Sequence, residues 1–317
     1  MTTTTAEERL RSRSAERLAI IARFRRRAVI AQTVRLTLAY GILVLVSCVT
    51  LVPLYWALAT SLKSYQEIVA YPPVFWPKEA LWSNYTFAMG KMNFLRSLRN
   101  TLILALGPTF GTVISASLVA YGFAKLRSPI RDGLFIFVLS TMMLPGFVTF
   151  IPVFVMYYRL HWTNTFFPFL VGSWFGGGAW NIFLLRQFFR TIPDDLLDSA
   201  RVDGAPELRI LFQIVMPLAK PILATIFLFS FMGGWNDYFG PYIYLTKKEL
   251  YPFALAIYKL RFEIPVTTAG ATGGSGASVS ENVVMAASLL VSAPLLVLFF
   301  FTQRYFIEGI TITGMRG

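Results

Sequence analysis

Few side chains in this sequence could carry out chemistry, and they are spread along the chain. Cys48 is the only cysteine and His161 the only histidine, which excludes an internal disulfide and a histidine-rich metal site. Serine, threonine and tyrosine are plentiful, but no base lies near them in the sequence to activate a nucleophile. Paired carboxylates, which general acid–base catalysis would use, are missing from the apolar stretches. The sequence therefore predicts no catalytic residue, no metal site and no enzyme.

One polar segment has the pattern of two short helices joined by a turn: TIPDDLLDSARVDGAPELRILFQIVMPLAKP, residues 191–221. Asp194 and Asp195 suit the first turn of a helix, where the helix dipole is positive. Gly204 offers the left-handed conformation that ends a helix, and Pro206 fits the first turn of the next one. We therefore expect a helix, a glycine turn and a second helix.

The second helix of this segment is expected to be amphipathic. Its apolar residues recur at i, i+3, i+4 and i+7, namely Leu208, Leu211, Phe212 and Val215. Pro217 and Pro221 then turn the chain back. An amphipathic helix pair can dock a soluble partner, and an ordinary solvated hairpin is the alternative interpretation of the same residues.

A second group of polar and aromatic residues lies inside an apolar stretch: Trp235, Asn236, Asp237 and Tyr238. An acid such as Asp237 costs about 2.5–3.5 kcal/mol at the centre of a bilayer, and less where it faces water or a partner. Sugars are bound by polar groups and stacked rings, so these four residues are candidates for lining a substrate path. Asp237 could equally cap its helix or brace it against another one.

The overall composition decides which elements position these residues. Of the 317 residues 56% are apolar and 14% are charged, whereas a soluble domain carries about 25% charged residues. That balance excludes a disordered chain and leaves too little polar surface for a water-soluble one. We therefore expect an all-α, polytopic membrane protein.

Six apolar windows reach the roughly 20 residues that a membrane-spanning helix needs. They are residues 36–62, 100–124, 133–158, 160–185, 221–246 and 282–303. The first window is too long and begins too late for a secretory signal peptide. Residues 264–280 are also uncharged, but their glycine and serine content predicts a flexible outer loop. The prediction is six transmembrane helices.

Helix-breaking residues are expected to interrupt the third and fourth windows. Pro145, followed by Pro152, predicts a bent third span, either at a transport path or as a tolerated kink. Glycines interrupt the fourth window at Gly172 and at residues 176–178. They suggest either a flexible break or close helix packing by small residues.

The distribution of positively charged residues predicts the orientation of the chain in the membrane. With the N-terminus inside, nineteen of the 29 lysines and arginines fall on cytoplasmic segments, which places both termini in the cytoplasm. The net charge of +13 then reflects anchors that face anionic membrane lipid and does not indicate nucleic acid. Residues 1–34 form a basic cytoplasmic lead, interpreted either as a helix on the inner membrane surface or as a solvated tail.

The 191–221 segment resembles the EAA loop of ABC-importer inner-membrane permeases, the inner-membrane components of binding-protein-dependent transport systems. The family pattern is Glu-Ala-Ala, three residues, Gly, nine residues, and an ending of the type apolar-any-Leu-Pro. Here Asp198, Ser199 and Ala200 stand at the start, Gly204 at the glycine and Pro217 at the end. Asp198 departs from the usual Glu and Ser199 from the first Ala, which puts a contact with the partner in doubt.

Two further stretches are similar to the MalG-like carbohydrate-transporter branch of these permeases. They are WNDYFGPYIYL at residues 235–245 and QRYFIEGITITGMRG at residues 303–317. The resemblance covers roughly residues 35–317 and implies a six-span permease domain in the bacterial inner membrane. It implies import of a sugar or oligosaccharide, with glycerol phosphate or another solute as the alternative.

The resemblance also implies a coupling element and its partners. Residues 198–206, including Asp203, Gly204, Ala205 and Pro206, would transmit the motion of a cytoplasmic ATPase dimer to the spans. A second permease subunit and an extracytoplasmic substrate-binding protein would complete the importer. ATP and Mg would be held by the ATPase, with no cofactor bound by this chain.

The lack of an energy source within this chain supports the same interpretation. The Gly90–Lys91 pair lacks the other residues of a phosphate-binding Walker loop, so ATP must be hydrolysed by another polypeptide. An ion-coupled secondary carrier is the alternative. Such carriers embed several acids or histidines in their spans, and here Asp237 stands alone.

Overall fold

The structure is a computed structural model that describes residues 4–262 and 281–314. In these two ranges every regular element is helical and no β-strand is present, which confirms the all-α prediction. The predicted glycine- and serine-rich loop, residues 264–280, lies outside the described residues. The chain divides into two compact units, residues 1–59 and residues 60–317.

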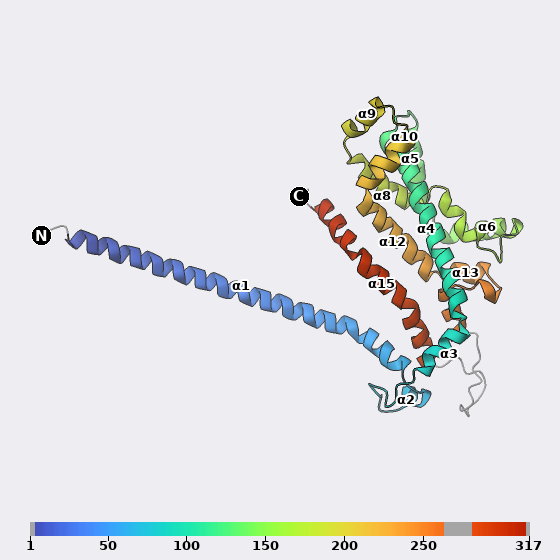
Figure 1. The fold of residues 1–317 in the computed structure, drawn as a ribbon, viewed down its shortest axis with the longest axis horizontal. Helices are drawn as coiled ribbons and strands as arrows, with labels where there is room; N and C mark the ends of the chain where they lie inside the picture. The colour runs from blue at the N-terminus through green and yellow to red at the C-terminus, as the bar shows by residue number, and fades with distance from the viewer. Residues whose placement is uncertain (1–3, 263–280, 315–317) are drawn as a thin grey trace. The chain divides into compact units, whose positions relative to one another are not determined.

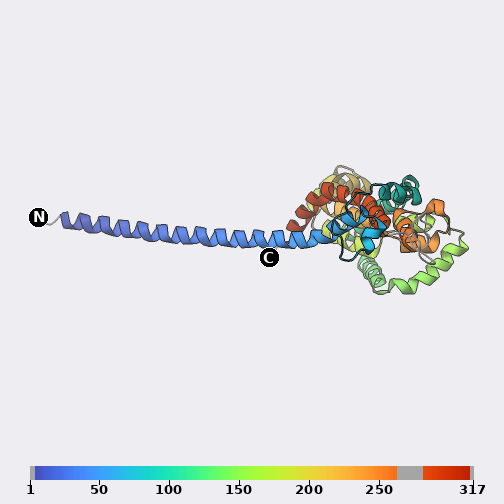
Figure 2. The ribbon, with the colours of Figure 1, turned by 90° about the horizontal axis from the view of Figure 1, so that it is seen from below.

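The first unit consists of helix α1 (Thr4–Ser61), which continues without a break (Figure 2). Residues Gln32–Ser61 of this helix are long and apolar enough to cross a membrane, in agreement with the first predicted window. The backbone is also helical through the basic lead from Thr4 onward. Whether residues 1–34 lie on the inner membrane surface stays a prediction, because side chains before residue 32 are outside the description.

The second unit holds the remaining helices, most of which are labelled in Figure 1. Those before the hairpin are α2 (Tyr65–Val69), α3 (Ser83–Lys91), α4 (Phe94–Lys125), α5 (Arg131–Ser140), the 3-10 turn η1 (Thr141–Met143), α6 (Gly146–Arg159), α7 (Phe167–Leu170), the 3-10 turn η2 (Gly172–Trp174) and α8 (Ala179–Arg190). Those that follow are α9 (Asp194–Val202), α10 (Glu207–Ile210), the π-helical turn η3 (Leu211–Val215), α11 (Met216–Leu218), α12 (Lys220–Asn236), α13 (Phe239–Tyr244), the 3-10 turn η4 (Lys248–Leu250), α14 (Phe253–Phe262) and α15 (Glu281–Gly314).

Three helices in the described ranges are long and apolar enough to span a membrane: those at Gln32–Ser61, Phe94–Lys125 and Glu281–Phe301. Two bent helix pairs raise this number to as many as five if each pair is one span. The pairs are Arg131–Met143 with Gly146–Arg159, bent by 96°, and Glu207–Leu218 with Lys220–Asn236, bent by 85°. The protein therefore has several membrane-spanning helices, and the total of six stays a prediction.

The predicted helix breakers account for the places where the windows are not continuous. Pro145 separates two helices at the 96° bend, which is a full break and not a gentle kink. The fourth window, residues 160–185, is divided among α7, η2 and the start of α8. Gly176, Gly177 and Gly178 all have positive φ angles there, a conformation that costs glycine little.

Helix α4 is the element on which the second unit is built. It packs along α12 and against α8 (Figure 1), and it also contacts the 172–174 turn. One apolar core joins it to α3, α12, α14 and α15, and a second core joins it to α5, α8 and the 191–221 segment. These two cores attach α4 to its neighbours through close side-chain packing, which is what holds helices together within a membrane.

Two glycines let backbones approach α4 closely. A Cβ placed on Gly177 would lie 2.7 Å from the carbonyl oxygen of Thr112, so this glycine provides close packing as well as a break. A Cβ placed on Gly234 in α12 would lie 2.8 Å from the carbonyl oxygen of Leu104. Pro108 in α4 has no N–H to donate to that carbonyl. The contact therefore falls where the α4 backbone lacks its usual helical hydrogen bond.

The close contact predicts a sharp difference between two adjacent glycines. Gly234→Ala should force α4 and α12 apart and destabilise the protein by about 1–3 kcal/mol, because the new methyl meets backbone atoms that cannot move aside. Gly233→Ala is the matched control, since a Cβ there has no atom within 4 Å. Thermal unfolding of the purified chain in detergent measures the difference. Equal melting temperatures for the two variants would contradict the α4–α12 packing.

Candidate functional site

The 191–221 segment forms the helical hairpin that the sequence predicts. Helix α9 covers Asp194–Val202 and ends at Gly204, whose φ of +79° is left-handed. The N–H of Ala205 donates to the Ala200 carbonyl, and the N–H of Gly204 donates to the Arg201 carbonyl, each at 3.0 Å. These two bonds make the glycine-terminated cap known as the Schellman motif. Pro206 lies at the N-cap of α10, one position before the expected first turn.

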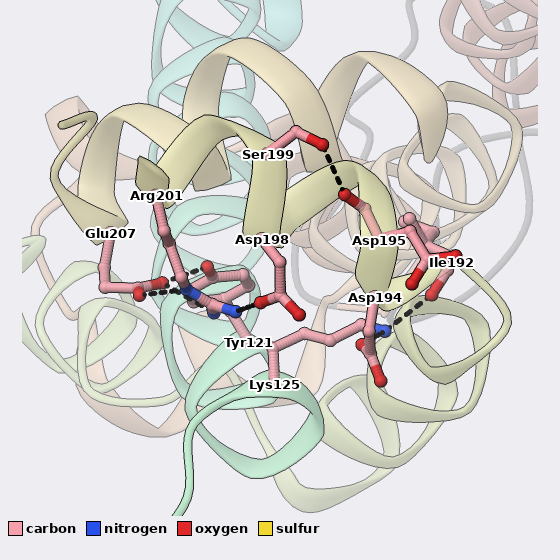
Figure 3. Close-up of polar contacts among 9 residues, drawn as sticks. All are labelled: Tyr121, Lys125, Ile192, Asp194, Asp195, Asp198, Ser199, Arg201 and Glu207. Carbon is pink, nitrogen blue, oxygen red and sulfur yellow. Dashed lines mark hydrogen bonds and ion pairs between the residues drawn. The ribbon is translucent and has the colours of Figure 1, made fainter. Parts of the chain in front are cut away.

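The start of the hairpin is fixed to the end of α4. Lys125 Nζ donates to the Ile192 carbonyl at 2.6 Å and to Asp194 Oδ1 at 2.7 Å (Figure 3). The Lys125 side chain is only 4% exposed, whereas the Asp194 side chain is 74% exposed. The hydrogen bond and the charge of Lys125 lower the pKa of Asp194. The bond is therefore present at neutral pH and is lost only when the pH falls through this lowered pKa.

The turn of the hairpin is held by a second polar group. Arg201 Nε donates to Glu207 Oε1 at 2.7 Å, and Arg201 Nη1 donates to Asp198 Oδ1 at 2.6 Å. From α4, the Tyr121 hydroxyl donates to Oε2 of Glu207, so the carboxylate joins three elements (Figure 3). The hydrogen bond from Arg201 is the main cause of a lowered pKa at Glu207, and its ion pair likewise weakens only as the pH falls through that value.

The apolar residues of the hairpin divide into a buried and an exposed set. Leu197, Ile210, Leu211 and Val215 are 1% exposed or less and belong to the core shared with α4 and α8. Facing outward are Leu196, Val202, Leu208 and Phe212, with exposed fractions of 44%, 86%, 61% and 45%.

The single apolar face expected for Leu208, Leu211, Phe212 and Val215 is therefore wrong. Leu211 and Val215 are buried, whereas Leu208 and Phe212 are exposed. The cause is the packing of Ile210, Leu211 and Val215 into the core with α4 and α8, which leaves the side of the helix that bears Leu208 and Phe212 uncovered. The hairpin consequently has an inner apolar face and a separate outer one.

The comparison with protein families gives the identity of the chain. Residues 111–312 match the model of the binding-protein-dependent transport system inner membrane component. This range covers more than half of the chain and contains the whole hairpin and the 235–245 stretch.

The chain belongs to this family of permeases. It is a permease subunit of a binding-protein-dependent ABC importer, a transport component and not an enzyme, and a multi-pass membrane protein.

Relatives extend the likeness over most of the permease. It is 30% identical over 280 residues to the arabinooligosaccharides transport system permease protein AraQ of Bacillus subtilis, covering 86% of this chain and 93% of AraQ. It is 32% identical over 266 residues to the sn-glycerol-3-phosphate transport system permease protein UgpE of Pectobacterium atrosepticum, covering 82% of this chain and 90% of UgpE. A crystal structure of a bacterial ABC transporter that imports the acidic polysaccharide alginate matches with a TM-score of 0.74 and 28% identity, over 85% of this chain and 95% of that one.

Most of the predicted coupling residues of the permease are exposed on the hairpin. Asp198, Ser199, Asp203, Gly204, Pro206 and Pro217 are exposed, whereas Ala200 and Ala205 are half-buried against the core. The Ser199 hydroxyl donates to the Asp195 carbonyl at 2.8 Å, so it stabilises α9 from within. The EAA-like start is thus accessible to a partner without any change in the hairpin.

Sequence reasoning missed the residues that attach the hairpin to α4. Tyr121 and Lys125 lie about 70 or more positions before their partners, so no local motif connects them. One signal was present: the two residues are four apart at the end of an apolar window, which puts them on one face of a helix. Glu207 directly follows Pro206, and the sequence pattern likewise predicted no functional role for it.

Of the predicted substrate-path residues, Trp235 lies in the interior. It is 2% exposed, packs against Phe231 and Phe253, and donates its Nε1–H to the Val291 carbonyl at 3.3 Å. Its position fits a residue that braces α12 against α15.

The other three path residues lie nearer the surface. Asn236 is exposed, and its amide donates to the Met232 carbonyl at 2.9 Å. Asp237 accepts the N–H of Gly240 at 3.0 Å, which caps the start of α13. Tyr238 is 46% exposed and stacks on Tyr258 with ring centroids 5.3 Å apart. The three residues form the end of α12 and the turn that follows it.

The left-handed turn gives a direct test of the hairpin. Gly204→Ala should destabilise it by about 1–2 kcal/mol, because alanine pays a steric cost at positive φ. Space is not the cause, since a Cβ at Gly204 has no atom within 4 Å. Gly204→Asn is the control, because asparagine adopts this conformation more readily. Hydrogen exchange of the α9 amides should rise in the alanine variant and much less in the asparagine variant. Equal exchange in both would contradict the observed turn.

Proposed function

We propose that the hairpin at residues 191–221 is the element through which a cytoplasmic ATPase drives this permease. The carrying observation is a set of apolar side chains of the hairpin that remain exposed, here called its outer face: Leu196, Val202, Leu208 and Phe212. Contiguous exposed apolar residues rimmed by polar ones mark interaction sites. Here the rim is supplied by Asp198, Asp203 and Arg209.

The internal contacts support the same role. Lys125 and Tyr121 attach the inner side of the hairpin to α4 and leave the outer side without such attachments among the described residues. A hairpin with one side fixed and the other accessible can transfer a push from a soluble subunit to a membrane helix. Of the EAA-like residues, Asp198, Ser199, Asp203, Gly204, Pro206 and Pro217 are exposed, which leaves them open to contact with a partner.

The proposed importer works by alternating access. ATP and Mg are bound by a dimer of cytoplasmic ATPase subunits, and closure of that dimer moves the hairpin. The spans of this chain and of a second permease subunit rock between inward- and outward-facing states, and hydrolysis resets them. A substrate-binding protein delivers the solute from outside, as in the solved alginate transporter in complex with its periplasmic protein.

The proposed topology is a six-span domain at residues 35–317 of a bacterial inner-membrane protein, with both termini in the cytoplasm. The excess of lysine and arginine on the hairpin side supports this orientation. The basic lead, residues 1–34, would then face the same cytoplasmic surface as the hairpin.

The proposed solute is a sugar or oligosaccharide. Two of the matched transporters carry arabinooligosaccharides and alginate, and glycerol phosphate is the second candidate because UgpE belongs to a glycerol-3-phosphate system. Asn236, Asp237 and Tyr238 are the proposed path residues. Trp235, buried next to them in the chain, would hold the end of α12 against α15. Because Asp237 is engaged in capping α13, it is a poor proton relay for an ion-coupled carrier.

Cross-linking tests the docking directly. In a Cys48→Ser background, Val202→Cys should form a thiol cross-link to a cysteine in the ATPase of the assembled importer, because residue 202 is 86% exposed on the outer face. Ser128→Cys is the matched control, since it is exposed and is also expected on the cytoplasmic side. Denaturing electrophoresis reads the product. Cross-linking at 128 but not at 202 would refute the coupling role of the hairpin.

A further inference from the structure

We infer that the Tyr121 hydroxyl of α4 is a positioning group that transmits hairpin motion into the spans through Glu207. This inference rests on the proposed coupling function of the hairpin. It adds the point within the permease at which motion of the hairpin becomes motion of a membrane helix.

The contact has the features of a rigid connection. Tyr121 is 3% exposed, so its ring is fixed in the core shared by α4 and the hairpin. Its hydroxyl donates to Oε2 of Glu207, and Arg201 holds both oxygens of the same carboxylate. Hydrogen bonds to charged groups are stronger than those between neutral groups. Rotation of the Glu207 side chain is therefore restrained from two directions.

A second attachment makes the connection resist rotation as well as separation. Lys125 binds Asp194 and the Ile192 carbonyl, at the opposite end of α9 from the turn. Tyr121 and Lys125 are one helical turn apart on α4. Lys125 thus holds the start of α9, and Tyr121 holds Glu207 at the start of α10, from consecutive turns of α4. With these two attachments, hairpin and helix can move as one body.

Helix α4 carries this motion to the proposed substrate path. From Tyr121 to Leu104 it extends about 25 Å at about 1.5 Å per residue. At Leu104 it meets Gly234 of α12 in backbone-to-backbone contact, two residues before Asn236. Two helices in such close contact cannot shift independently, because packed interiors do not deform continuously. The chain of contacts thus connects the hairpin turn to the end of α12.

The test measures coupling in the complete importer, with its ATPases, second permease and binding protein in proteoliposomes. Tyr121→Phe keeps the buried ring and removes only the hydroxyl. It should raise the number of ATP molecules hydrolysed per solute imported about fivefold or more, which is the lower range of typical coupling effects. Tyr251→Phe is the matched control, since it also removes one hydroxyl bond, to the Thr246 carbonyl, outside the hairpin.

A double variant separates a specific contact from general damage. Glu207→Ala removes the acceptor of the Tyr121 hydroxyl and should also raise the ATP-to-solute ratio. Adding Tyr121→Phe to it should raise the ratio no further, because the contact is already absent. Additive effects would overturn the inference. So would an unchanged ratio in Tyr121→Phe, or loss of the assembled complex in Tyr121→Phe but not in Tyr251→Phe, which would show a role in stability alone.

The outcomes also distinguish this inference from the proposed function. In the Tyr121→Phe variant, the cross-link from Val202→Cys to the ATPase should persist, because the outer face is unchanged. Cross-linking with an unchanged ATP-to-solute ratio would overturn the transmission role and leave the docking role intact. If Val202→Cys does not cross-link even with Tyr121 present, the docking role itself fails.

Discussion

The carboxylate of Glu207 is the point on which the attachment of the hairpin to the rest of this permease depends. It receives hydrogen bonds from Arg201 within the hairpin and from Tyr121 of α4, so it connects the turn to a membrane-spanning helix. Without a partner, a carboxylate in this half-buried position would be costly, and with two donors it becomes a fixed junction. The Schellman turn at Gly204 and the short α10 place Glu207 opposite Arg201. Local backbone geometry and long-range attachment therefore depend on each other here.

The division of the hairpin into two apolar faces explains how one small element can serve two neighbours. The inner residues Ile210, Leu211 and Val215 stabilise the attachment to α4 and α8. The outer residues Val202 and Leu208 add nothing comparable to the fold of this chain, because they remain exposed. Exposed apolar side chains promote aggregation of an isolated subunit, whereas in an assembled transporter they can form the contact with a partner. The permease is consistent with a component that is completed by its partners.

Much of this arrangement could be predicted from the sequence. Apolar windows identified the long helices, Asp194 and Gly204 marked the limits of α9, and Pro145 marked the sharp bend between α5 and α6. Each of these signals is local, because it follows from backbone conformation or from hydrophobic length. The glycine interruption of the fourth window was likewise visible, although its tight contact with Thr112 was only one of two interpretations.

What the sequence could not provide were the features that depend on tertiary packing. Which side of the second hairpin helix is buried depends on the core with α4 and α8, which covers Leu211 and Val215 and leaves Leu208 and Phe212 exposed. The partners of Glu207 and Asp194 lie on α4, far away in sequence, and a single sequence has no signal for such pairs. Burial of Trp235 similarly follows from the packing of α12 against α15.

The central claim is that the hairpin is bound by an ATPase subunit and moves together with α4. The most direct measurement is an electron cryomicroscopy structure of the assembled importer in nucleotide-free and ATP-bound states. The account predicts Val202 and Leu208 against a nucleotide-binding subunit in both states, with the Tyr121–Glu207 bond retained while the spans change their tilt. A hairpin surrounded by solvent or lipid, with no ATPase in contact, would contradict it.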